Sequence, residues 1–182
     1  MSKITLVTGG SRSGKSTFAE NILKDYDEVL YIATAIVTDK EMEDRIKRHR
    51  EERNNLWETH EGYKNLDLAL EKYNKKYVLL DCVTVMTTNF LFEKEIDFDN
   101  FSKEDMDNMV NYIKEEFRKL IEKARELNIE LVMVTNEVGW GIVPEYRLSR
   151  IFRDIAGFIN QYIAKLADEV YLVSCGLPLK LK

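Results

Sequence analysis

The sequence predicts an α/β fold, one domain over residues 1–182 in which a mostly parallel sheet is flanked by helices. Short apolar runs rich in β-branched or aromatic residues alternate with longer stretches of helical periodicity. Such alternation is typical of a parallel sheet that is covered on both faces. The chain of 182 residues is long enough for one domain with a full core. A glycine-rich motif also follows the first apolar run directly, where a strand would pass into a helix.

The expected elements follow from these patterns in chain order. Strands are expected over residues 4–8, 29–33, 77–81, 131–135 and 169–173. Helices are expected over residues 18–23, 40–53, 66–73 and 106–127, and a further helix opened by Pro144 runs to Leu166. Residues 93–107 are acidic and carry few apolar positions, so we expect an exposed connection there.

Composition excludes several classes of protein. The net charge of −5 argues against nucleic acid as a partner, because nucleic-acid binding needs a basic face. No apolar run approaches the roughly 20 residues that span a bilayer, and no signal peptide precedes the first strand. Cys82 and Cys175 form no metal-ligand pattern, and we expect two buried free thiols. The expectation is a soluble cytoplasmic protein.

The glycine-rich motif reads G-G-S-R-S-G-K-S and has the spacing of a phosphate-binding P-loop. Backbone N–H groups of such a loop point at an anion, and the helix that follows adds its positive end. Lys15 would reach the β- and γ-phosphates, and the Ser16 hydroxyl would help to hold Mg²⁺. The alternative is a glycine-rich turn that matches by chance. The predicted nucleotide-binding residues here are Gly9, Gly10, Ser11, Arg12, Ser13, Gly14, Lys15 and Ser16.

A second candidate is a histidine among arginines in the charged stretch 40–53. Two interpretations stay open: a solvated helix stabilised by its own ion pairs, or a catalytic helix. In the catalytic interpretation, His49 attacks an α-phosphorus while the neighbouring cations neutralise the phosphates. Those cations would also help to keep the imidazole neutral, as a nucleophile must be.

Carboxylates and glycines follow two other strands. Asp81 ends an apolar strand, where it could support Mg²⁺ or cap the next helix. Residues 136–144 place two glycines around Trp140, which fits either a ligand-binding loop or a structural turn. Residues 57–61 are expected to form either a short strand or a loop, and His60 within them is expected to be structural or exposed.

Several segments together resemble a known family. They are the P-loop, Y-I-A-T-A at residues 31–35, R-I-x-x-H-R at 45–50, W-E-T at 57–59, L-D-C-V-T at 80–84, T-N-E-V-G-W-G-I-V-P at 135–144, F-R-D-I-A-G-F-I-N-Q at 152–161 and A-D-E-V-Y-L-V at 167–173. The sequence is similar, nearly from end to end, to bifunctional adenosylcobinamide kinase/adenosylcobinamide-phosphate guanylyltransferase of cobalamin synthesis. The resemblance implies a RecA-like P-loop fold and a homotrimer.

The resemblance also implies site residues and partners. It implies that His49 becomes linked to GMP, that Glu61 and Asp81 contact nucleotide or metal, and that Lys15 serves the kinase step. The further nucleotide-binding residues implied are Thr34, Ala35, Ile36, Arg50, Glu51, Glu52 and Arg53. ATP or GTP, Mg²⁺ and a small-molecule corrinoid are the implied ligands.

Two reactions would then share one triphosphate site. Because they need different phosphorus atoms in reach, we expect either that the helix carrying His49 moves or that the triphosphate binds in two poses. The rival interpretations are a P-loop small-molecule kinase without guanylyltransferase activity, and a nucleotide-gated interaction module.

Overall fold

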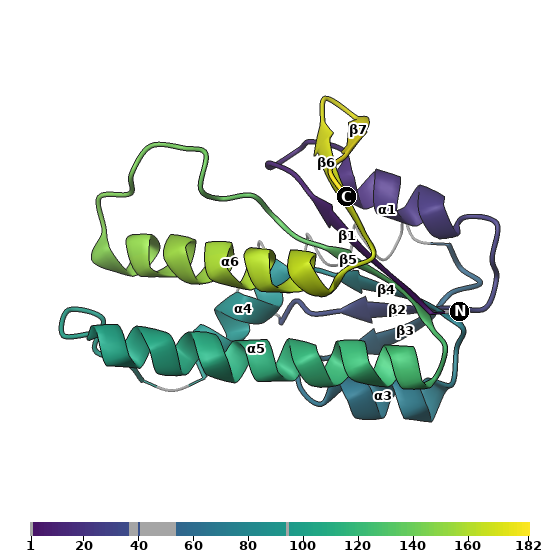
Figure 1. The fold of residues 1–182 in the computed structure, drawn as a ribbon, viewed down its shortest axis with the longest axis horizontal. Helices are drawn as coiled ribbons and strands as arrows, with labels where there is room; N and C mark the ends of the chain where they lie inside the picture. Colours follow the sequence, from purple (N-terminus) through teal and green to yellow (C-terminus); the bar gives the residue numbers. More distant parts are fainter. Residues whose placement is uncertain (1, 37–39, 41–53, 94) are drawn as a thin grey trace.

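The computed structural model describes residues 2–36, 40, 54–93 and 95–182. Within them, one seven-stranded sheet has the order β3-β2-β4-β5-β1-β6-β7 (Figure 1). All neighbouring strands are parallel except β7, which pairs antiparallel with β6. The strands are β1 (Lys3–Thr8), β2 (Val29–Ala33), β3 (Glu58–Glu61), β4 (Tyr77–Asp81), β5 (Glu130–Val134), β6 (Glu169–Ser174) and β7 (Leu177–Lys180).

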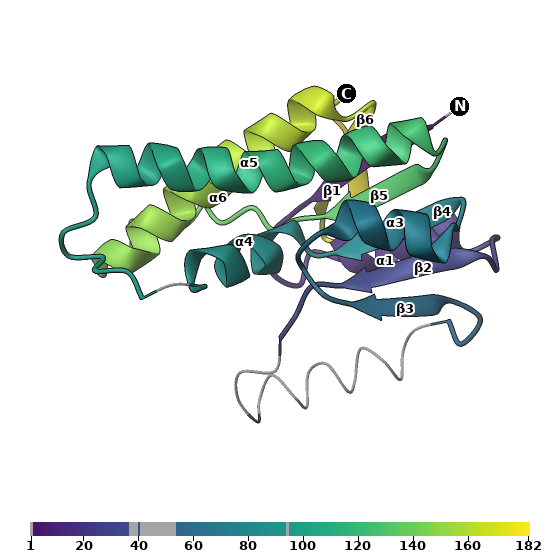
Figure 2. The same cartoon turned by 90° about the horizontal axis from the view of Figure 1, so that it is seen from below.

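Helices cover both faces of this sheet. Helix α1 (Lys15–Leu23) packs on one face, while α3 (Leu66–Tyr73), α4 (Val83–Leu91), α5 (Lys103–Glu126) and α6 (Arg147–Leu166) cover the other (Figures 1 and 2). Alternate residues of β1 serve the two faces: Ile4 and Leu6 join the larger core, and Val7 joins the core under α1. The α/β class expected from the sequence, a mostly parallel sheet flanked by helices, is therefore confirmed.

All five expected strands are present, with ends that differ from expectation by one residue at most. The sequence analysis missed α4 and β7 as regular elements, and it left β3 open between strand and loop. Strand β7 contains Pro178 and lies at the edge of the sheet, which is where a proline is tolerated in a strand.

Three helix starts were placed wrongly. Helix α1 begins at Lys15 rather than 18, directly after Gly14 at its N-cap. Helix α6 begins at Arg147, because Tyr146 at its N-cap is still extended, so Pro144 lies in the preceding loop and does not open the helix. Helix α5 begins at Lys103 rather than 106, because Ser102 and Asp105 form a capping box. The expected helix 40–53 lies outside the described residues, apart from Lys40.

The expectation of an exposed connection over residues 93–107 is wrong in part. Phe101 is buried, and Ile96 and Phe98 pack against the larger core. The guanidinium of Arg147 donates hydrogen bonds to the carbonyl oxygens of Asp99 at 2.8 Å and Phe101 at 2.7 Å. This segment is therefore fastened to the first turn of α6.

The two cysteines also differ from expectation. Cys82 is buried and free, as expected, whereas Cys175 is exposed. Cys175 lies in the turn between β6 and β7 with φ +53°, so it does not continue the apolar strand before it. None of the helices in the described part of the chain combines the length and apolarity that crossing a bilayer requires.

Candidate functional site

The predicted site residues that the structure describes gather at the carboxyl edge of the sheet. Ala33 at the end of β2 is in register with Glu61 on one side and Asp81 on the other. The backbone continues this alignment, since Thr34 N–H donates to Asp81 O at 3.1 Å and Gly62 N–H donates to Ala33 O at 3.1 Å. Parallel α/β sheets bind ligands at this edge.

The glycine-rich motif forms the turn between β1 and α1 at the same edge. Lys15 begins α1, and its Nζ donates to the carbonyl oxygen of Gly10 at 3.1 Å. Gly14 occupies the N-cap with φ +90°, in the left-handed region that favours glycine, and no side chain caps the helix. No side chain therefore caps the first N–H groups of α1. These groups can donate to a bound anion, as anion binding at a helix start requires.

The turn between β6 and β7 supports this loop. Gly176 N–H donates to Ser13 O at 2.8 Å, and a Cβ atom on Gly14 would lie 3.0 Å from Gly176 Cα. A Cβ atom on Gly9 would lie only 2.5 Å from the carbonyl oxygen of Val173. Sequence reasoning missed this contact, for which the only local signal is Gly176 itself.

Two hydroxyl oxygens beside the loop are buried without a partner. Among the described residues, Thr8 Oγ1 and Ser13 Oγ have no hydrogen bond. An orphaned buried hydroxyl is costly, by about 1–3 kcal/mol, unless a ligand or water satisfies it. These atoms therefore favour a polar ligand at the loop.

Asp81 faces β2 across the strand ends. The hydroxyl of Tyr31 donates to Asp81 Oδ2 at 2.8 Å, which holds the carboxylate. The alternative that Asp81 caps the next helix is not observed, because the N-cap of α4 is Cys82 and no side chain caps it. Burial raises the pKa of the Cys82 thiol to about 12, so this cysteine stays protonated at neutral pH.

A chain of buried hydrogen bonds ties the strand ends together, and sequence reasoning missed it. Thr34 is fully buried, and its hydroxyl bonds to the N–H of Cys82 at 2.8 Å and to the carbonyl of Cys82 at 2.9 Å. The Thr135 hydroxyl donates to Asn160 Oδ1 at 2.7 Å and lies 3.1 Å from the Thr84 hydroxyl. The strand-end loops of β2, β4 and β5 are thereby held against α4 and α6.

Other predicted residues fall at the margin of the site or beyond the described part of the chain. Ala35 and Ile36 follow Thr34, and the Ile36 side chain is exposed. His60 is half-buried against Tyr73, and burial lowers its pKa, in agreement with a structural role. His49, Arg50, Glu51, Glu52 and Arg53 lie outside the described residues.

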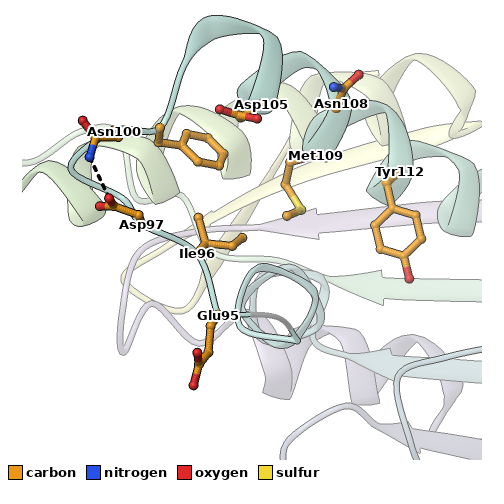
Figure 3. Close-up of a pocket in the computed structure, with 9 residues that line it drawn as sticks. Glu95, Ile96, Asp97, Asn100, Asp105, Asn108, Met109 and Tyr112 are labelled. Atoms are coloured by element: carbon orange, nitrogen blue, oxygen red, sulfur yellow. Dashed lines mark hydrogen bonds between the residues drawn. The ribbon is translucent and has the colours of Figure 1, made fainter.

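A pocket of about 500 Å³ lies between residues 95–101 and the first turns of α5 (Figure 3). Among the residues with a described placement, no predicted site residue lines it. Its carboxylates serve local structure: Asp97 accepts a hydrogen bond from Asn100 at 2.7 Å, and Asp105 closes the capping box with Ser102. No group of three metal-ligating His, Cys, Asp or Glu side chains occurs among the described residues.

Fold and site define a P-loop nucleotide-binding protein of the α/β class, with the loop at the carboxyl edge of the sheet. The family model for cobinamide kinase / cobinamide phosphate guanyltransferase matches residues 5–181. The chain belongs to that family.

Similar proteins agree with this assignment. The "bifunctional adenosylcobalamin biosynthesis protein CobU" of Escherichia coli K12 is 46% identical over 181 residues, covering 97% of this chain and 98% of the relative. CobU of Salmonella typhimurium LT2 is 45% identical over 179 residues, with the same coverage. A KaiC-like protein from Pyrococcus horikoshii is a distant structural neighbour, with a TM-score of 0.49, 14% identity, and coverage of 93% of this chain and 71% of that chain.

Proposed function

We propose that this chain phosphorylates adenosylcobinamide with ATP or GTP and then transfers GMP from GTP to the product, giving adenosylcobinamide-GDP and pyrophosphate. The family match over nearly the whole chain is the observation that carries this proposal. The P-loop at the carboxyl edge of the sheet supports the nucleotide half of it. Residues 1–182 would act as one domain.

In the kinase step, the aminopropanol hydroxyl of the corrinoid attacks the γ-phosphorus. The new P–O bond forms as the bond to the β-phosphate oxygen breaks, and the hydroxyl loses its proton. Lys15 and the loop N–H groups stabilise the charge on the transferring group, and holding the reactants in line supplies most of the rate. Lys15 already lies at the start of α1, beside the loop carbonyls.

A magnesium ion fits the donors that the proposal assigns to it. Ser16 offers a hydroxyl oxygen and Asp81 a carboxylate that Tyr31 holds in place, both hard oxygen ligands. Mg²⁺ usually keeps several waters and takes substrate phosphates as further ligands, so two protein donors suffice. When bound, the ion would neutralise charge on the phosphates.

In the transferase step, a ring nitrogen of His49 attacks the α-phosphorus of GTP and pyrophosphate leaves. The phosphate oxygen of adenosylcobinamide phosphate then attacks the same phosphorus and frees the imidazole. This divides one difficult transfer into two easier ones. The arginines Arg50 and Arg53 next to His49 in sequence would neutralise the phosphates.

Incubation with α-labelled GTP tests the transferase half. The protein should acquire a label that is labile in acid and stable in alkali, as expected of a phosphoramidate, and His49→Ala should lose it. The chain offers a matched control, because His60 is the second of its two histidines, and His60→Ala should keep the label. Phosphorylation of cobinamide without any protein label would instead favour the small-molecule kinase.

Incubation with adenosylcobinamide, GTP and Mg²⁺, followed by mass spectrometry, tests the kinase half. The corrinoid should gain the mass of one phosphoryl group, or of that group and a further GMP, and Lys15→Ala should abolish both products. Unchanged phosphorylation in that variant would contradict the role of Lys15. We also propose that the protein is a homotrimer, on the family resemblance, and native mass spectrometry tests this assembly. The two free thiols favour a cytoplasmic location.

A further inference from the structure

The loop between β5 and α6 presents an unusual number of large apolar side chains to solvent. Within seven consecutive positions, Trp140 is 73% exposed, Ile142 95%, Val143 63% and Tyr146 74%. Ile142 is the most exposed large apolar residue in the described part of the chain. Single exposed apolar residues are ordinary, whereas a cluster of them marks a binding surface.

The base of this loop is fixed to the P-loop. Glu137 N–H donates to the carbonyl oxygen of Gly9 at 3.0 Å, and Glu137 Oε1 accepts from Gly139 N–H at 2.9 Å. Asn136 N–H donates to the buried Thr84 hydroxyl at 2.7 Å. A ligand resting on the loop therefore lies next to the phosphate-binding turn.

The far end of the loop is fixed as well. The guanidinium of Arg150 donates to the carbonyl oxygens of Pro144, at 2.9 Å, and of Glu145. The loop thus arches from the centre of the sheet edge to the start of α6 (Figure 1). Both of its ends are held by hydrogen bonds, and its apolar side chains are exposed. Fixed ends keep the entropic cost of binding low.

We infer that residues 137–146 form the surface that receives the corrin ring of the acceptor, with Trp140 and Ile142 as its main contacts. This inference rests on the proposed function. The acceptor must bring one hydroxyl to the γ-phosphate at the P-loop, while the rest of it is a large macrocycle with methyl-bearing hydrocarbon faces. Such a face matches an exposed apolar patch on a loop whose base is bonded to Gly9.

The size of the patch also favours a ligand over a second protein chain. A covered aromatic side chain contributes about 150–250 Å², so the two aromatic and two aliphatic side chains together offer a few hundred Å². A stable protein interface covers about 800 Å² on each partner. The patch is adequate for one face of a macrocycle and small for a protein interface by itself.

The test compares Trp140→Ala and Ile142→Ser with the wild type in the kinase assay and in equilibrium dialysis of adenosylcobinamide without nucleotide. Each variant should raise the KM and the Kd for the corrinoid about ten-fold or more, because burying such a side chain is worth at least a factor of ten. The KM for GTP should stay unchanged. Trp140→Phe should recover most of the corrinoid affinity.

Leu181→Ala is the matched control. Leu181 is 58% exposed, but it pairs with Val170 at the amino edge of the sheet, opposite the P-loop. Its removal should leave both the corrinoid and the GTP constants unchanged.

Three outcomes would overturn the inference. An unchanged KM and Kd for the corrinoid in both loop variants would mean that Trp140 and Ile142 do not contact the corrin ring. A proportional rise in the KM for GTP would mean that the loop only shapes the P-loop. A loss of assembly in native mass spectrometry, with corrinoid binding intact, would make the loop a contact between copies. A wild-type protein that does not phosphorylate cobinamide would instead refute the proposed function, and this inference with it.

Discussion

At the scale of single residues, the two adjacent glycines that open the P-loop meet different surroundings. A Cβ atom on Gly9 would lie 2.5 Å from the backbone oxygen of Val173, whereas one on Gly10 would meet nothing within 4 Å. Gly9→Ala should therefore lower the free energy of unfolding by about 1–3 kcal/mol, the usual cost of overpacking. Urea unfolding without nucleotide measures this.

Gly10→Ala is the control for that measurement. Its free energy of unfolding should stay within about 0.5 kcal/mol of the wild type, as for a substitution into open space. An equal loss in the free energy of unfolding in the two variants would mean that β6 does not pack closely against Gly9.

The two cysteines should react very differently with an alkylating reagent. Cys82 is buried with a pKa of about 12, and Cys175 is exposed in a turn. Because the thiolate is the reactive form, iodoacetamide at pH 8 should add one group to the native protein, on Cys175, and a second only after unfolding. Intact-mass analysis and peptide mapping count and locate the adducts. Rapid double alkylation of the native protein would contradict the burial of Cys82.

At the scale of elements, one carboxylate joins three strands at the edge of the sheet. Glu169 on β6 accepts from Lys180 on β7 at 2.7 Å and pairs with Lys3 on β1 at 2.9 Å. These hydrogen bonds, first from Lys180 and then from Lys3, lower the pKa of Glu169 from its usual 4.5 to about 2.

A carboxylate with a lowered pKa stabilises the fold fully above its unfolded pKa and loses that contribution as the pH falls towards the folded pKa. Both lysines are about half exposed, so solvent screening reduces the gain to about 1 kcal/mol. Glu169→Gln should cost that amount at pH 7, and the difference should shrink between pH 4.5 and pH 2. Urea unfolding across this range measures it, and a constant difference would contradict the assignment.

How far the sequence predicted the elements depended on how local their signals are. The apolar runs of β1, β2 and β4 need only their own residues to be recognised as strands. Helix α4 was missed because its sequence V-T-V-M-T-T-N-F-L is rich in β-branched residues, which have low helix propensity. It is helical because six of its nine residues are buried against the sheet and the other helices, so tertiary packing outweighs propensity.

At the scale of the whole molecule, a bound nucleotide should stabilise the fold by mass action. At a GTP concentration of about 100 times the Kd, the gain is about 2.7 kcal/mol. For a chain of this size that corresponds to a rise in Tm of roughly 5–10 °C. Differential scanning fluorimetry with GTP and Mg²⁺ should show it, and Lys15→Ala should lose most of it. An equal rise in both proteins would mean that GTP binds elsewhere.

The candidate site was predictable where it depends on strand ends and not where it depends on distant partners. The spacing of the P-loop and the position of Asp81 after an apolar run are signals that are local in the sequence. The P-loop and Asp81 both lie at the carboxyl edge, as expected. The support of that edge by Asn160, Thr84 and Gly176 was not predictable, because the hydrogen bonds join segments that only the fold brings together. Sequence spacing gives the local conformation of a segment and leaves its neighbours undetermined.

The order of the strands sets a distance at this edge. Strand β5 lies between β1 and β4, so two inter-strand gaps, roughly 10 Å in all, separate the strand that leads into the P-loop from the one that carries Asp81. A ligand that meets both the loop and that carboxylate therefore lies over the end of the intervening strand, beneath the start of the space that α1 spans between β1 and β4. The end of β5 therefore forms the floor of the space between the loop and the carboxylate.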